Sequence, residues 1–141
     1  MIRGYVIDAD GREVTDCLAC RCGEPLMADN DFHQQASVTM EALEDATVVE
    51  VPLEQVERML AKYPELWKLY EQLVMWSADL HRQLKMLLYQ YSAAQRYRWF
   101  LDNYPGVIDR IPHRYVASYL NMTPVTLSKM RHQLRQQDPE G

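Results

Sequence analysis

Three cysteines lie within six positions of one another and are the residues best suited to metal or redox chemistry. Cys17, Cys20 and Cys22 form a C-x2-C-x-C pattern, and His33 is a possible fourth ligand. Tetrahedral zinc takes four good ligands, and iron–sulfur clusters usually take four cysteines. The pattern therefore favours reduced thiols at the end of a strand, with no metal and no cofactor. A thiol-based metal or redox sensor stays open as an alternative.

The chain shows no other arrangement typical of catalysis. No stretch resembles a nucleophile–base pair, a phosphate-binding loop or a pair of catalytic acids, so we do not expect an enzyme. The remaining chemistry is that of cations near the C-terminus. Residues 1–63 hold 5 Lys and Arg against 13 Asp and Glu, whereas residues 110–141 hold 5 against 2. A basic end on an acidic chain indicates that this end alone meets phosphate groups.

The elements that must position these cations are two short helices within Pro112–Arg135. Apolar residues recur at steps of three and four in both helices, which is the period of one helical face. Thr123-Pro124 is a start signal, because the hydroxyl can cap free amides and proline fits the first helical position. Asn121 stands in the turn, and asparagine tolerates the left-handed conformation that such turns need. The pattern predicts a helix-turn-helix.

This stretch resembles the DNA-binding helix-turn-helix of the Crp/Fnr family of bacterial transcription regulators. The likeness extends upstream through RYRWFLDNYPGVIDRIPHRYVASYLNMTPVTLSKMR. It implies a homodimer on double-stranded DNA, with RNA polymerase as a further partner. It also implies that Pro124, Val125, Ser128 and Lys129 face base edges, while Thr123, Arg114 and Arg131 contact phosphates. The full set of expected DNA-binding residues is Arg114, Thr123, Pro124, Val125, Thr126, Ser128, Lys129 and Arg131.

A long helix is expected from Pro64 to about Tyr91, because no residue in this stretch breaks it. Its apolar seam exceeds what so small a domain needs for its own core, which predicts dimerisation through the seam. The helix matches the family's dimer axis in position. The expected interface residues are Leu66, Leu69, Leu73, Trp76, Leu80, Leu84, Leu87 and Tyr91.

The N-terminal part favours strands. A hairpin is expected around Asp10-Gly11, and two more strands around Glu44-Asp45. GYVIDADGREVTDCLACRCGEPL resembles the middle of the family's effector β-roll, whose leading helix and first strands are absent. A partner chain completes the roll, or this sector is poorly ordered, or the start codon is assigned late. Counting back from the strand expected at 46–51 places Ala36 where cyclic-AMP-binding members hold a phosphate arginine, so we expect no response to cyclic AMP.

Together these patterns predict an α+β chain in three parts: a partial antiparallel β-roll (1–63), a long dimerisation helix (64–91) and a helix-turn-helix domain (92–141). No apolar run approaches a membrane span, and no signal peptide is evident, so we expect a cytoplasmic protein. The expected function is a DNA-binding transcription regulator. The alternative from another class is a truncated dimerising protein that titrates full-length relatives.

Overall fold

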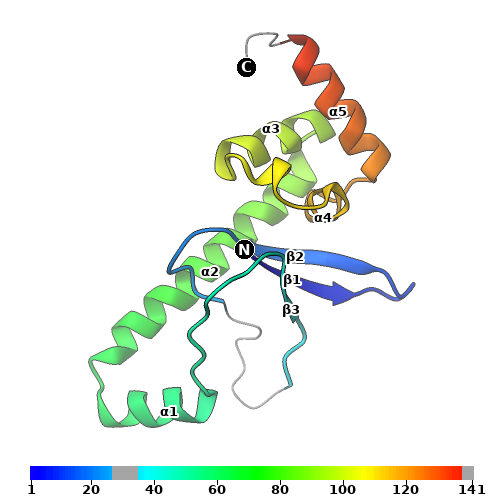
Figure 1. The fold of residues 1–141 in the computed structure, drawn as a ribbon. Helices are drawn as coiled ribbons and strands as arrows, with labels where there is room; N and C mark the ends of the chain where they lie inside the picture. Colours follow the sequence, from blue (N-terminus) through cyan, green and yellow to red (C-terminus); the bar gives the residue numbers. More distant parts are fainter. Residues whose placement is uncertain (27–34, 138–141) are drawn as a thin grey trace.

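A computed structural model describes residues 1–26 and 35–137 as a mixed α and β fold. Its described elements are a three-stranded antiparallel sheet, five α-helices and one short 3-10 helix (Figure 1). The long helix α2 runs through the molecule, with α1 near its first end and α3, α4 and α5 beyond its last end. The sheet lies between these two ends. In the part of the chain that is described, no helix has the length and apolar character needed to cross a membrane.

The sheet has the order β2-β1-β3. The predicted hairpin is confirmed: β1 (Ile2–Ile7) pairs antiparallel with β2 (Glu13–Ala19). Gly11 takes a φ of +77° in the turn, a conformation that glycine adopts without strain. The third strand, β3 (Thr39–Ala42), pairs with the other edge of β1.

The sequence predicted a second strand after Glu44-Asp45, and this prediction is wrong. Residues 46–51 form no strand, although Thr47, Val48, Val49 and Val51 have high strand propensity. Val49 is 91% exposed, so within residues 1–26 and 35–137 no strand or apolar surface covers it. Strand propensity depends on packing against neighbours, and here that packing is missing. The count that assigned Ala36 to the phosphate position rested on this strand, although the stretch from Gly23 to Ser37 still contains no arginine.

The helices follow their sequence signals closely. They are α1 (Leu53–Lys62), α2 (Leu66–Gln90), α3 (Ala93–Asn103), α4 (His113–Tyr119) and α5 (Pro124–Gln137), with the 3-10 helix η1 (Val107–Asp109) before α4. Ser92 caps α3 through a reciprocal capping box with Gln95, which satisfies two free amides at the helix start. Pro52 is the residue before α1, and α2 begins two residues after Pro64, where the long helix was expected to start.

One apolar core joins parts of the chain that are far apart in the sequence. Phe100, Val116, Leu120 and Leu127 are fully buried at its centre. Leu18 of β2 belongs to the same cluster. The segments 1–63 and 92–141 therefore share a core in this chain, and β2 packs directly on α4.

Candidate nucleic-acid interface

Helices α4 and α5 are held by a four-residue turn with a defined backbone. Asn121 has a φ of +48°, the left-handed conformation that its residue type predicted. The amide of Met122 donates to the carbonyl of Ala117 at 2.9 Å. The amide of Asn121 donates to the carbonyl of Ser118 at 3.0 Å. These bonds satisfy carbonyls at the end of α4 and fix where α5 begins.

The turn supports a stability prediction at Asn121. Replacement by glycine should leave the free energy of unfolding nearly unchanged, because glycine accepts positive φ without strain. Asn121→Val should lower it by about 1–3 kcal/mol, since a β-branched residue is strained at this φ. Urea denaturation of the two variants measures the difference. Equal stability of the valine and glycine variants would contradict the role assigned to the turn.

The start of α5 is capped as predicted. The Thr123 hydroxyl accepts a hydrogen bond from the Thr126 amide at 3.1 Å, and Pro124 is the first residue of the helix. Beyond this cap, the side chains at Val125, Ser128 and Lys129 are exposed, with Val125 at 65%. Leu127, on the opposite face, is fully buried against α4. The helix therefore presents a polar and weakly apolar face to solvent from a fixed support.

Two of the expected phosphate contacts are already engaged within the chain. The Arg114 guanidinium donates to the Tyr115 hydroxyl at 3.0 Å. Arg131 lies 2.7 Å from His113 Nε2 and forms an ion pair with Asp109 at 3.7 Å. The side chain of Arg131 is only 21% exposed. Arg131 therefore ties α5 to the start of α4 and to η1, a structural contact that sequence spacing alone did not indicate.

The expected dimer seam on α2 divides into exposed and covered residues. Leu69, Trp76 and Tyr91 are 54%, 45% and 45% exposed. Leu66, Leu73, Leu80 and Leu84 are half-buried in the chain itself. Leu87 is only 4% exposed and belongs to the chain's own core, so its assignment to a dimer interface is wrong. Near the end of α2, Leu87 belongs to the same buried cluster as Leu18 and Phe100, so this part of the helix packs on its own chain.

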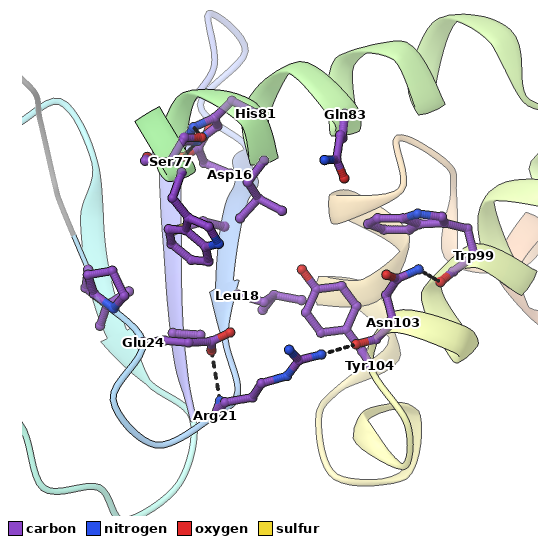
Figure 2. Close-up of a pocket in the computed structure, with 16 residues that line it drawn as sticks. Asp16, Leu18, Arg21, Glu24, Ser77, His81, Gln83, Trp99, Asn103 and Tyr104 are labelled. Carbon is purple, nitrogen blue, oxygen red and sulfur yellow. Dashed lines mark hydrogen bonds and ion pairs between the residues drawn. The ribbon is translucent and has the colours of Figure 1, made fainter. Parts of the chain in front are cut away.

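Trp76 and Leu80 also line a pocket of about 200 Å³ between β2, α2 and α3 (Figure 2). Trp99 and Tyr104 stand on its α3 side, and the Arg21 guanidinium donates to the carbonyl of Asn103 across its floor at 3.2 Å. Trp76 and Leu80 of the seam therefore face β2 and α3 of the same chain. Outside the seam, α2 also exposes large apolar residues, including Trp67, Met75 and Tyr89.

The cysteines are free thiols in the structure. Burial, with the Glu24 carboxylate nearby, raises the pKa of Cys20 to about 11. Burial also raises the pKa of Cys17, and Cys22 is exposed. Thiols with raised pKa values are poor nucleophiles at neutral pH. Among the residues that the structure describes, no group of three or more His, Cys, Asp or Glu side chains is placed to hold a metal ion. His33 lies outside the described residues.

A hydrogen-bonded tyrosine pair connects α4, on which α5 packs, to the end of α3. The hydroxyls of Tyr104 and Tyr119 lie 2.9 Å apart, and Tyr119 is 2% exposed. Burial raises the pKa of both phenols, so the pair stays neutral at physiological pH. This contact, which sequence reasoning missed, fixes α4 against the end of α3. Its only sequence signal is the recurrence of tyrosine on two apolar faces.

The chain matches no protein-family model and no curated protein.

Proposed function

We propose that this protein is a DNA-binding transcription regulator of Crp/Fnr type, acting as a homodimer, in which α4 and α5 form a helix-turn-helix. The observation that carries the proposal is the pair α4 and α5 itself. A left-handed residue closes its turn, a fully buried leucine holds α5 from one side, and an exposed face carries Lys129, Ser128 and Val125 on the other. Such a face fits the major groove, where lysine reads guanine and apolar groups meet the thymine methyl.

The exposed apolar residues of α2 support the dimer. The seam residues Leu69, Trp76 and Tyr91 are each 45% or more exposed, which is apolar surface typical of an interface. Two recognition helices related by a two-fold axis would meet half-sites roughly 34 Å apart. RNA polymerase follows as a partner from the proposed family alone.

The first experiment is a gel shift with labelled genomic fragments around the protein's own gene. A sequence-specific regulator should still shift one labelled fragment when unlabelled random duplex is present in excess. The second candidate function, a dimerising protein that titrates full-length relatives, is favoured by the same exposed surface on α2. It predicts dimers without sequence-specific retention of any fragment. Co-purification with a full-length relative would then support it.

Base reading is tested by comparing two cations of α5. Lys129→Ala should cost about 1–3 kcal/mol on a specific site and much less on random duplex, because it removes a base contact. Arg131→Ala should weaken binding to all sequences alike. Fluorescence anisotropy on both duplexes measures these effects. Equal losses by Lys129→Ala on specific and random duplexes would show that Lys129 contacts phosphate only.

Arg131 requires a control, because it also holds His113 and Asp109. Asp109→Asn breaks the same ion pair but leaves the cation in place. If Asp109→Asn lowers DNA affinity as much as Arg131→Ala does, the loss comes from misplacement of α5. If it does not, the charge of Arg131 itself contributes to binding.

A further inference from the structure

The pocket between β2, α2 and α3 is lined largely by aromatic and aliphatic side chains (Figure 2). Trp76 of α2 and Trp99 of α3 line it together with Tyr104, and Leu18 of β2 lies on the sheet side. The rings of Trp99 and Tyr104 meet edge to face, with their centroids 6.0 Å apart. Pockets for drug-sized ligands measure about 300–1,000 Å³. A pocket of about 200 Å³ therefore takes a smaller molecule, such as one aromatic ring with a short side chain.

A β-bulge places a carboxylate at this pocket. Gly4 on β1 pairs with Cys17, and the next residue, Tyr5, pairs with Thr15. Asp16 lies between these two pairs and has no partner on β1. Bulges of this kind interrupt the ladder and change the direction of a side chain, and they are frequent beside binding sites. Asp16 lines the pocket from this position.

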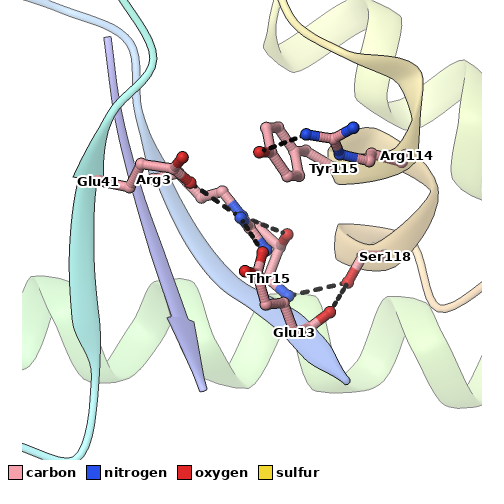
Figure 3. A network of polar contacts seen from close by, with 7 residues as sticks. All are labelled: Arg3, Glu13, Thr15, Glu41, Arg114, Tyr115 and Ser118. Carbon is pink, nitrogen blue, oxygen red and sulfur yellow. Dashed lines mark hydrogen bonds and ion pairs between the residues drawn. The ribbon is translucent and has the colours of Figure 1, made fainter. Parts of the chain in front are cut away.

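The strand residue before Asp16 is held from two sides. The amide of Thr15 donates to the Ser118 hydroxyl of α4 at 2.8 Å, and the hydroxyl of Thr15 accepts from Arg3 at 3.0 Å (Figure 3). Arg3 is only 1% exposed, so this contact lies inside the protein. The backbone that carries Asp16 is therefore fixed before any ligand binds.

A histidine on α2 faces Asp16 and offers a second hydrogen-bond acceptor. Nδ1 of His81 lies 2.9 Å from the Ser77 carbonyl oxygen. A carbonyl oxygen only accepts, so Nδ1 carries the hydrogen of the neutral ring, and Nε2 is then an acceptor. This Nε2 lies 3.6 Å from the Asp16 carboxylate. Two acceptors this close together are suited to a ligand group that donates N–H hydrogen bonds.

A second carboxylate lies on the floor of the pocket. Oε2 of Glu24 accepts from the amides of Cys20 at 2.6 Å and Arg21 at 2.8 Å, which fixes the side chain. The Arg21 guanidinium donates to the Asn103 carbonyl at 3.2 Å. With neutral imidazole, the lining therefore holds two carboxylates, Asp16 and Glu24, against one guanidinium. Its net charge is negative.

We propose that this pocket binds a small aromatic ammonium ion, a molecule with one ring and a protonated amine. The ring packs against Trp76, Trp99 and Leu18, and the ammonium donates to Asp16 and to Nε2 of His81. Aromatic faces and a carboxylate both stabilise an organic cation, whereas the negative lining repels an anion of the same shape. This small-molecule site goes beyond the proposed function, and it does not depend on DNA binding.

The test uses phenethylamine, which carries a protonated amine two carbons from a phenyl ring. Trp76 and Trp99 are two of the chain's three tryptophans, so binding should change the tryptophan fluorescence in a saturable way. Phenylacetate has the same ring with a carboxylate, and it should bind at least about tenfold more weakly, because like charges then meet. Butylamine keeps the ammonium but lacks the ring, and it should also bind at least about tenfold more weakly.

Asp16→Asn should weaken phenethylamine binding by about five- to twentyfold, since it removes the charge that the ammonium meets. The matched control is Asp79→Asn, which makes the same charge change on α2, where the carboxylate pairs with Arg82 at 3.1 Å outside the pocket. The control should bind phenethylamine as the wild type does. If thermal melting shows that Asp16→Asn is unfolded, Trp76→Leu replaces it, because Trp76 lies outside the buried core. Calorimetry should then show weaker phenethylamine binding.

Four results overturn the site. They are equal or tighter binding of phenylacetate or butylamine, unchanged affinity in the pocket variant, an equal loss in the Asp79 control, and no binding of phenethylamine at millimolar concentrations. None of these measurements involves DNA. Their failure leaves the proposed function in place, and a failure of DNA binding leaves this site in place.

Discussion

Leu69→Lys should convert the protein from dimer to monomer without unfolding it. Leu69 is 54% exposed, so a lysine there costs the single chain little. In a dimer built on the seam of α2, the same lysine puts an unpaired charge into a desolvated interface, which costs several kcal/mol. Sedimentation should show the monomer, and far-UV circular dichroism should be unchanged.

The loss of the dimer should also reduce DNA affinity by about 10²–10⁴-fold, because the two half-sites are then bound separately. Met75→Lys is the matched control. Met75 is 59% exposed on the same helix but lies outside the seam, so this variant should stay dimeric. A wild-type chain that sediments as a monomer at tens of micromolar would refute the seam. Dimer loss in the Met75 variant as well would move the interface to another face of α2.

Leu127→Ala should have the largest effect on stability. Leu127 is 0% exposed and holds α5 on α4, and its truncation leaves a cavity that the surrounding helices cannot fully close. The expected loss is about 2–5 kcal/mol in the free energy of unfolding. For a chain of this length, the melting temperature should fall by roughly 10 °C, measured by calorimetry.

Val125→Ala supplies the control on the same helix. Val125 is 65% exposed, so its truncation should change the stability by less than about 0.5 kcal/mol. It should nevertheless weaken binding to sites with a thymine at the contacted position, because the methyl contact is lost. A Leu127 variant as stable as the Val125 variant would mean that α5 does not depend on α4 for its position.

The amino-acid sequence determined the local elements of this protein. The period of apolar residues placed α2, α4 and α5, and capping residues placed their starts, because these signals act within a few residues of one another. Asn121 predicted the positive φ of the turn for the same reason. Likewise, the Asp10-Gly11 turn placed the first hairpin.

Only the tertiary structure decided what covers these elements. Residues 46–51 read as a strand, yet none of the described strands pairs with them. Leu87 fits the seam by spacing, yet the core of the same chain buries it. Arg131 reads as a free cation, yet His113 and Asp109 hold it. Packing between segments that are distant in the sequence decides such cases, and a local sequence pattern does not encode that packing. The hydrogen bond between Thr15 on β2 and Ser118 on α4 arises in the same way, because residues far apart in the sequence meet only when the sheet docks on the helix.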